Sequence, residues 1–167
     1  MDADEFKNRV FVLKDKLFRL SNRLLDDKPE AEDVTQEVMM KLWEMHEKLD
    51  GYQSIEALAM TTTRNLSLDK IRHQKVRWLH AGNRKPETEY TDNASEKKDL
   101  DAWVKKIMAQ LPEIQQTIMH LLDVEGMEYE EIAPIVDMNV ETIRVNLSRT
   151  RKKVREELTK IMEYGLN

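Results

Sequence analysis

Residues 127–160, M-E-Y-E-E-I-A-P-I-V-D-M-N-V-E-T-I-R-V-N-L-S-R-T-R-K-K-V-R-E-E-L-T-K, are the stretch that says most about the fold. Their pattern predicts a short amphipathic helix, a turn at 137–139 and a long helix that starts at Val140. Asn139 is a suitable N-cap because its side-chain oxygen can accept hydrogen bonds from the free amides of the following turn. This succession is typical of a DNA-binding helix-turn-helix. A helical hairpin with a solvated basic face would give the same pattern, so this stretch alone leaves both interpretations open.

The long second helix has two faces of different chemistry. Its apolar residues recur at helical spacing and predict a buried stripe of Ile143, Leu147, Val154, Leu158 and Ile161. Its opposite face carries the basic residues Arg144, Arg149, Lys152, Lys153 and Arg155. Pro134 lies inside the short first helix, where it removes a hydrogen bond to Glu130 at a cost on the order of 3 kcal/mol. We therefore expect a kink or an early helix end at Pro134.

Charge is distributed unevenly along the 167 residues. The formal net charge is −5, yet seven basic and three acidic residues lie between Glu141 and Lys160. Five basic residues and one acidic residue lie between Arg64 and Arg77. Solvated helix faces produce one such cluster often and two less often. Two basic segments on an acidic protein therefore indicate two separate nucleic-acid contacts.

The composition favours an all-α protein that does not insert into membranes. Charged residues make up 35% of the chain, and there are only four glycines and four prolines, which favours long helices over sheets. No apolar run approaches the roughly 20 residues that span a bilayer. The first residues, M-D-A-D-E, lack the basic and apolar parts of a signal peptide. We therefore expect a cytoplasmic protein.

Sequence motifs for catalysis and cofactor binding are missing. The chain has no cysteine, so it can form no disulfide, thiolate metal site or thiol nucleophile. The four histidines, at positions 46, 73, 80 and 120, are scattered, and no glycine-rich phosphate loop or nucleophile elbow occurs. We therefore predict that the protein is not an enzyme and that it uses no metal and no cofactor.

Apolar periodicity divides the chain into two helical domains. In the first half, helices are expected at 6–25, 30–49 and 54–79. The third of these should start at a Ser54 cap and bury Leu58, Leu66, Leu68 and Ile71. Periodicity disappears between 81 and 99, where Gly, Pro, Ser, Asn and charged residues predominate, and it returns at Trp103. Pro112 should then open a further helix before the helix-turn-helix. We predict one domain at 1–78, a flexible linker at 79–100 and a second domain at 101–167.

The ordered set of motifs resembles a known family, the small bacterial sigma factors of the extracytoplasmic-function type (group IV of the sigma-70 family). Residues 31–44, A-E-D-V-T-Q-E-V-M-M-K-L-W-E, resemble region 2.2, and residues 63–72, T-R-N-L-S-L-D-K-I-R, resemble regions 2.3 and 2.4. Residues 111–121, L-P-E-I-Q-Q-T-I-M-H-L, and 129–155 resemble region 4. The resemblance covers nearly the whole chain, and the short linker matches the group that lacks regions 1.1 and 3. It implies a non-enzymatic subunit that recruits core RNA polymerase to promoters.

The resemblance implies two binding surfaces in the first domain. Region 2.2 of the family docks on the polymerase β′ subunit, and the matching polar residues on one helix face are Asp33, Gln36 and Glu37. Region 2 also melts and holds the −10 promoter element, which implies DNA contacts from Arg64, Asn65, Asp69, Lys70, Arg72, His73, Lys75 and Arg77. Asp69 is unexpected on a DNA-facing helix, and a pair with Arg72 or His73 three or four residues along the helix would explain it.

One departure from the family lies just before the R-N motif. Many relatives carry an aromatic pair there, whereas this chain has Leu58, Ala59 and Met60. A base-stacking role is therefore not expected in this short stretch. Thr61, Thr62 and the loop at 49–54 are the alternative candidates for contacts with unstacked bases.

The resemblance implies that the recognition helix of region 4 enters the major groove of the −35 element. The implied contact residues are Thr142, Arg144, Val145, Asn146, Ser148, Arg149 and Lys152. Arg144 and Arg149 suit bidentate guanine or phosphate contacts, Val145 suits a thymine methyl group and Asn146 suits adenine. Relatives often carry Ser-Arg at 145–146, so we expect a different sequence preference.

The implied partners are the core polymerase, through its β′ and β subunits, promoter DNA and an anti-sigma factor. Two other interpretations remain open on the residues alone. A polymerase-independent helix-turn-helix regulator that binds operators as a dimer would leave the basic segment at 64–77 unexplained. A helical interaction protein with solvated basic faces would leave both basic segments to chance.

Overall fold

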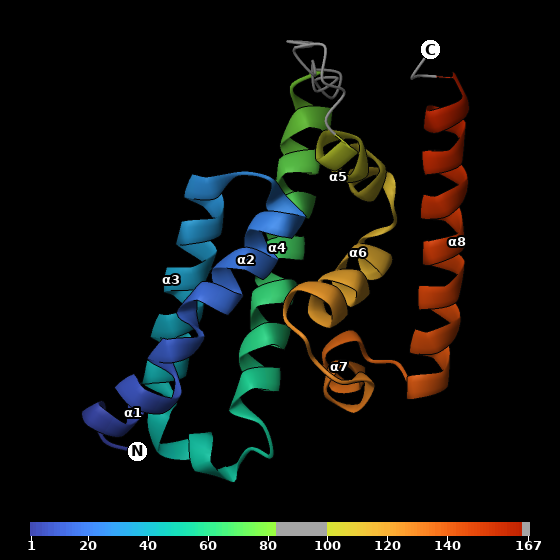
Figure 1. The fold of residues 1–167 in the computed structure, drawn as a ribbon. Coiled ribbons are helices and arrows are strands. Elements are labelled where there is room, and N and C mark those ends of the chain that lie inside the picture. Colours follow the sequence, from blue (N-terminus) through green and yellow to red (C-terminus); the bar gives the residue numbers. More distant parts are fainter. Residues whose placement is uncertain (83–99, 165–167) are drawn as a thin grey trace.

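The computed structural model describes residues 1–82 and 100–164. The elements, in chain order, are α1 (Ala3–Arg9), η1 (Phe11–Leu13), α2 (Lys14–Leu25), α3 (Lys28–Glu44), η2 (His46–Gly51), α4 (Ile55–His80), α5 (Leu100–Gln110), α6 (Glu113–Met119), η3 (His120–Val124), α7 (Tyr129–Val136) and α8 (Val140–Tyr164) (Figure 1). The elements η1 and η2 are 3₁₀ helices, and η3 is a π-helical turn. No strand occurs in the described parts of the chain, which confirms the all-α prediction. The linker was predicted at 79–100; its ends belong to α4 and α5, and its part from 83 to 99 lies outside the described residues.

The first half is built from α2, α3 and α4, which pack against one another. Leu17 and Leu20 of α2 and Val34 and Val38 of α3 are fully buried between these helices. The helix predicted over 6–25 is interrupted, since α1 ends at Arg9 and η1 precedes α2.

The second predicted helix ends earlier than expected. Helix α3 stops at Glu44 and continues as η2, which still buries Leu49. A His46 ring nitrogen lies 2.7 Å from the Trp43 carbonyl oxygen, so this side chain competes with the backbone for that acceptor. The competition gives a local reason for the change from α-helix to 3₁₀ helix.

The most buried residues of α4 are not the predicted ones, although Leu58 and Leu66 pack against the core. Leu58, Leu66, Leu68 and Ile71 are only half-buried, whereas the buried residues are Ala59, Met60, Thr63 and Ser67. The hydroxyl groups of Thr63 and Ser67 donate to backbone carbonyls one turn earlier, at 2.8 Å in both cases. The Ser67 hydroxyl also lies 3.0 Å from the buried Ser21 hydroxyl of α2. Small hydroxyl residues can therefore be buried without an unsatisfied polar group, and they let α2 and α4 approach closely.

Turn chemistry fixes the helices of the second half. Pro112 occupies the N-cap of α6, as predicted, and Gly126 has a φ of +65°, a conformation that glycine adopts without strain. Asp137 ends α7 in the left-handed conformation. Helix α7 continues two residues past Pro134, so the expected early end at the proline was wrong. Pro134 is exposed, which leaves the Glu130 carbonyl near solvent, where water can satisfy it.

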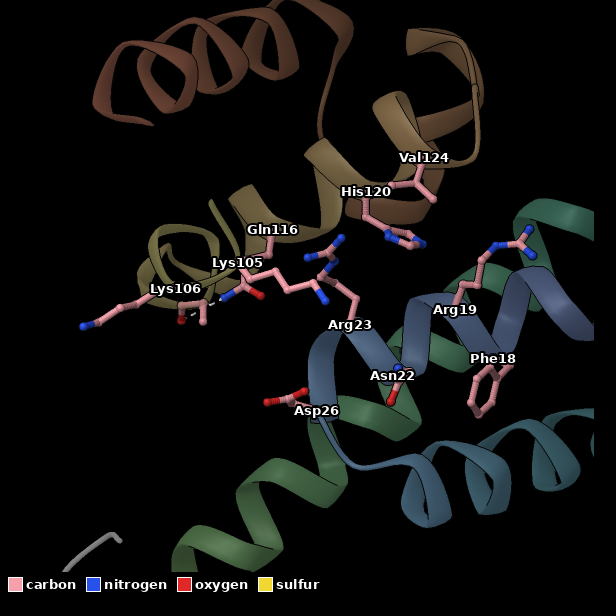
Figure 2. Close-up of a pocket in the computed structure, with 11 residues that line it drawn as sticks. Phe18, Arg19, Asn22, Arg23, Asp26, Lys105, Lys106, Gln116, His120 and Val124 are labelled. Carbon is pink, nitrogen blue, oxygen red and sulfur yellow. Dashed lines mark hydrogen bonds between the residues drawn. The ribbon is translucent and has the colours of Figure 1, made fainter. Parts of the chain in front are cut away.

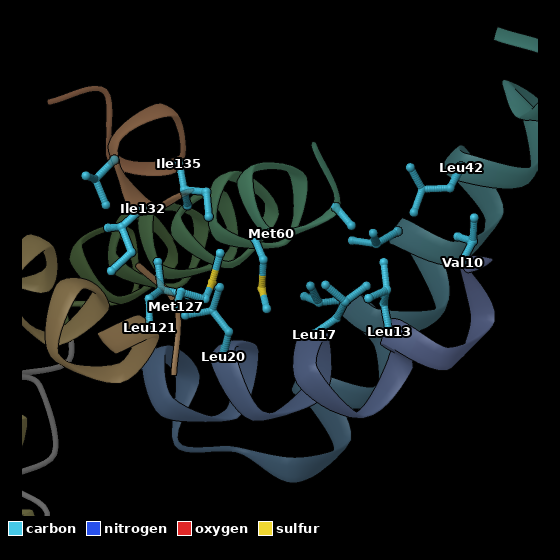
Figure 3. Packing of buried hydrophobic residues seen from close by; sticks show 14 of the residues in the cluster. Val10, Leu13, Leu17, Leu20, Leu42, Met60, Leu121, Met127, Ile132 and Ile135 are labelled. Atoms are coloured by element: carbon cyan, nitrogen blue, oxygen red, sulfur yellow. The ribbon is translucent and has the colours of Figure 1, made fainter. Parts of the chain in front are cut away.

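The two halves share one hydrophobic core. Leu20 and Met60 from the first half belong to the same buried cluster as Leu121, Met127 and Ile132 from the second (Figure 3). Helix α4 contacts α7, and α2 contacts α6 and η3. Helix α8 packs on α5, α6 and α7 at the outer side of the molecule, away from α2 and α3 (Figure 1). The structure is therefore a closed arrangement in which the second half covers part of the first.

Candidate nucleic-acid interface

The α8 surface is held in place by its cap and its buried stripe. The Asn139 side-chain oxygen accepts a hydrogen bond from the Thr142 amide at 2.8 Å, which confirms the predicted N-cap. Ile143 and Leu147 are buried, and the opposite face stays in solvent. The exposed residues of the predicted −35 set are Thr142, Arg144, Val145, Ser148, Arg149 and Lys152. Six of the seven predicted −35 residues thus share one accessible helix face, as groove contacts require.

Arg144 and Asn146 of the predicted −35 set have partners within the helix-turn-helix. Arg144 lies over the Tyr129 ring of α7, with its guanidinium carbon 5.2 Å from the ring centroid. This cation–π contact orients Arg144 along the helix-turn-helix. Asn146 is half-buried, and its amide donates to the Thr142 carbonyl at 3.0 Å. Asn146 must therefore break a backbone contact before it can read a base.

Two residues of the predicted −10 set form ion pairs with other helices. Arg64 of α4 donates two hydrogen bonds to the Glu113 carboxylate of α6, at 2.8 and 3.0 Å. Lys70 donates to the Glu30 carboxylate of α3 at 2.6 Å, and this bond raises the pKa of Lys70. Both side chains are half-buried and paired in the closed arrangement.

The remaining residues of the predicted −10 set lie in solvent along α4. Asn65, Asp69, Arg72, His73, Lys75 and Arg77 are all exposed. Arg72 donates to Asp69 at 3.3 Å, three residues apart on the helix, which confirms the intrahelical pair that explains this carboxylate. The basic segment therefore contains two half-buried, paired side chains, Arg64 against the second half and Lys70 against α3, among exposed ones.

The alternative candidates for base contacts differ in availability. The hydroxyl groups of Thr61 and Thr62 donate to the Ala57 and Leu58 carbonyls at 2.7 and 2.8 Å, so both are used within the helix. In the loop before α4, Tyr52 exposes 44% of its surface. The sequence analysis pointed to this loop without naming Tyr52, although an aromatic residue between η2 and α4 is the visible signal for base stacking.

A third surface lies on the exposed face of α3. Asp33, Gln36 and Glu37 are all exposed there, and the Glu37 carboxylate lies 3.6 Å from the Lys41 ammonium group. The apolar residues Met40 and Trp43 continue this face with 64% and 43% of their surfaces exposed. Neither residue was predicted from the sequence, although Met40 lies four residues after Gln36 and Trp43 three residues after Met40, a helical spacing that the sequence shows. Exposed apolar groups of this size beside polar ones are typical of a protein contact.

An ion pair and a buried histidine also join the two halves. Arg19 of α2 donates to both oxygens of the Glu125 carboxylate, at 2.7 and 2.9 Å. Burial would raise the pKa of Glu125, but the hydrogen bonds and charge of Arg19 outweigh burial and hold it below its usual value. The neighbouring His120 is buried, and burial lowers its pKa to about 4, with the charges of Arg23 and Arg19 adding to the effect and Glu125 opposing it. His120 is therefore neutral at pH 7.

Two further features of the described ranges concern metal-type side-chain clusters and membrane-length helices. Across residues 1–82 and 100–164, no group of three or more His, Asp or Glu side chains is placed to hold a metal ion. Within the same ranges, no helix has the length and apolar character that crossing a membrane requires.

Comparisons with known proteins assign both halves to one family. The family description "Sigma-70 region 2" matches residues 12–77, and "Sigma-70, region 4" matches residues 101–154. The chain is similar to the ECF RNA polymerase sigma factor SigW of Bacillus subtilis, with 24% identity over 94% of this chain and 90% of the relative. It is also similar to the ECF RNA polymerase sigma factor SigE of Mycolicibacterium smegmatis, with 28% identity over 87% of this chain and 58% of the relative.

A solved structure shares the fold. The sigma factor RpoE of Bartonella quintana, crystallised in complex with the anti-sigma factor NepR, has a TM-score of 0.77 to this chain. The match covers 94% of this chain and 98% of RpoE at 23% identity. The arrangement of helices in the closed structure therefore has a counterpart in an experimental structure.

Proposed function

Since the chain belongs to the sigma-70 family, in its extracytoplasmic-function group, we propose how its three surfaces divide the work of a promoter-recognising RNA polymerase sigma factor. The α3 face binds the β′ subunit of the core polymerase, α4 contacts the −10 element and α8 enters the major groove of the −35 element. The observation that carries this division is the separation of the two basic helices, α4 and α8, which lie in different halves of the chain (Figure 1). The protein acts with the polymerase in the cytoplasm and contributes no catalytic chemistry of its own.

The polymerase contact centres on a polar and apolar patch. Gln36, Met40 and Trp43 follow one another at three- or four-residue spacing on α3, so they lie on one face. Trp43 is held edge-on against Phe6, with ring centroids 5.0 Å apart, and stacks on His46 at 4.5 Å. A rigid aromatic group of this kind loses little conformational entropy on binding, which suits an interface anchor.

We propose that the two halves separate when the protein binds a promoter. The −10 and −35 elements lie roughly 25 base pairs apart, which is about 85 Å at about 3.4 Å per base pair. The closed arrangement instead packs α4 against α7 and keeps Arg64 on Glu113. A segment as long as 83–99 can span at most about 60 Å, which allows the domains at 1–78 and 101–167 to move apart without losing their tether. Two weak DNA contacts then act as one through effective concentration.

An anti-sigma factor is the third proposed partner. The B. quintana relative was crystallised with such a protein, and the shared fold makes a similar complex a reasonable expectation for this chain. A protein of this kind would act by covering the polymerase or DNA surfaces named above.

Reconstitution with purified core polymerase tests the proposed function. The chain should form a stoichiometric complex that starts transcription from selected promoters. Gln36→Lys should weaken complex formation with unchanged helicity and melting temperature, whereas Arg149→Ala should leave the complex intact and weaken the use of its promoters. A complex that starts transcription equally on any DNA, or no complex, would contradict the proposal.

A further inference from the structure

A groove of about 440 Å³ runs between the two halves, along α2 on one side and α5, α6 and η3 on the other (Figure 2). A second hollow of about 500 Å³ adjoins it and shares Arg23, Lys105 and His120 with it. Volumes of this order are typical of small-molecule sites. None of the residues proposed for polymerase or DNA contacts lines this groove.

Two positively charged side chains face each other inside the groove. Figure 2 shows Arg23 from α2 and Lys105 from α5 reaching toward each other across it. Among the described residues, neither side chain has an ion-pair or hydrogen-bond partner, whereas neighbouring Arg19 is held by Glu125. The lining also contains the carboxylate of Asp26, which has no ion-pair partner in the described ranges. Asp101 and Asp123 line the adjoining hollow. The two cations that face each other repel, and an anion bound between them would convert this repulsion to attraction.

A buried polar ring lies in the same place. His120 is 4% exposed and lines both hollows, and neither of its ring nitrogens has a hydrogen-bond partner in the described structure. Its Nε2 lies 3.3 Å from a Glu125 oxygen, but not in hydrogen-bond geometry. A buried imidazole without a partner is costly, which makes a missing acceptor at this position physically reasonable. The neutral ring has one N–H group to donate, and the charges of Arg19 and Arg23 help to keep its pKa low.

We propose that this groove binds a small phosphorylated molecule, with its phosphate groups held by Arg23, Lys105 and His120. The guanidinium group offers a planar fork of donors that matches phosphate oxygens, the ammonium group adds a point charge, and the imidazole adds a neutral donor. A single inorganic phosphate would leave most of the volume empty, so a molecule with two or more phosphate groups and an organic part fits the groove better.

The ligand would also link the two halves of the protein. Arg23 belongs to the first half, whereas Lys105 and His120 belong to the second, so binding requires the closed arrangement. At a ligand concentration 100 times its Kd, the ratio of closed to open molecules rises about 100-fold. This regulatory consequence rests on the proposed function, because it matters only if promoter binding opens the protein. The binding itself does not depend on that proposal.

Calorimetry on the full chain tests the site, with pyrophosphate and ATP as probes and with citrate and sulfate at equal ionic strength as comparisons. We expect saturable binding of one pyrophosphate or ATP per chain. Lys105→Gln and Arg23→Gln should each weaken it at least tenfold, and Lys7→Gln, an exposed lysine on α1, should leave it unchanged. Lys105 is exposed, so its variant should fold normally, and circular dichroism checks both groove variants.

Several outcomes would overturn the proposal. Absence of saturable binding at millimolar probe would remove the site, and equal affinity for citrate would remove the preference for phosphate. Equal binding by the wild type and both groove variants would place the anion elsewhere, for example on the basic face of α8. A chain that binds ATP but forms no complex with core polymerase would leave the groove assignment standing and contradict only the proposed function.

Discussion

The Arg64–Glu113 ion pair is the contact whose removal should open the protein most directly. Two charge-assisted hydrogen bonds, at 2.8 and 3.0 Å, join side chains that are 16% and 29% exposed. The Thr117 hydroxyl also donates to the Glu113 carboxylate at 2.8 Å. Fully exposed ion pairs contribute at most about 1 kcal/mol, and single hydrogen bonds to charged groups about 1.5–3 kcal/mol. This partly shielded, bidentate pair should stabilise the closed arrangement by about 2 kcal/mol.

Glu113→Ala should therefore shift the ratio of open to closed molecules about 30-fold toward the open form, since about 1.4 kcal/mol corresponds to a factor of ten. The wild-type chain has no cysteine, so two engineered ones can carry fluorescent labels without further changes. Glu32→Cys on α3 and Lys153→Cys on α8 place labels on exposed positions in opposite halves. Single-molecule energy transfer between them then measures the open fraction. Glu47→Ala, an exposed glutamate without an ion-pair partner within the described structure, is the matched control.

A charge exchange makes the prediction stricter. The double variant Arg64→Glu with Glu113→Arg should restore much of the closed population, whereas each single exchange should open the protein. A double-mutant cycle that gives a coupling energy below about 0.5 kcal/mol would refute the reasoning, because the two side chains would then act independently. An open fraction that changes equally for Glu113→Ala and Glu47→Ala would refute it as well.

Three further predictions address other parts of the structure. Because the pKa of His120 falls to about 4 on folding, from about 6.5 when unfolded, the unfolded chain takes up its proton first. The free energy of unfolding should therefore fall by roughly 3 kcal/mol as pH drops from 7 to 4, and the lowered pKa of Glu125 acts in the same direction. Urea titrations of the wild type and His120→Gln at a series of pH values measure this fall. Identical slopes of the unfolding free energy against pH for the two proteins would contradict the prediction. Arg149→Ala should weaken binding to a matching −35 element by roughly 1–3 kcal/mol, measured by fluorescence anisotropy with holoenzyme, and unchanged affinity would remove Arg149 from the contact set. Asn139→Ala should lower the free energy of unfolding by about 1 kcal/mol, whereas Asn139→Ser should lower it much less; equal losses for both would exclude a capping role.

Local patterns were enough to predict most helices, their caps and the helix-turn-helix. Leu17, Val34 and Ile143 each belong to an apolar stripe of their own helix, and each is buried, as the helical spacing of its stripe predicts. The caps at Ser54 and Asn139 depend only on residues three positions away, so they too could be recognised in the sequence. Both the buried stripes and the helix caps are determined by residues that lie within one or two helical turns of each other.

The buried face of α4 could not be predicted from hydrophobicity. Thr63 and Ser67 look like surface residues, but their hydroxyl groups bond to the backbone and to Ser21 of another helix. The half-buried leucines on the same helix looked like the core. Where α2 and α4 pack closely, only small side chains fit between them, so which residues of α4 are buried depends on the partner helix.

The ion pairs between the two halves could not be predicted from the sequence. Arg64 and Glu113 lie 49 residues apart, and Arg19 and Glu125 lie 106 residues apart, so no local spacing connects them. Seen alone, the basic segment containing Arg64 and Lys70 indicated free positive charge ready for DNA. The fold instead pairs both side chains with carboxylates, which explains how an acidic protein can carry this segment without holding it permanently available.

This pairing has a thermodynamic consequence for promoter binding. In the closed arrangement Glu113 takes up the Nε and Nη2 donors of Arg64, so closure competes with any −10 contact that needs those donors. Linkage then requires that DNA weaken the closed arrangement by the same factor by which closure weakens the affinity for DNA. Glu113→Ala, which favours the open form about 30-fold, should therefore raise the affinity of the free protein for −10 DNA by up to that factor, provided the closed form predominates in the wild type. The substitution adds no DNA-binding group of its own, so such a gain would come from the release of Arg64 and of the closed arrangement that holds it.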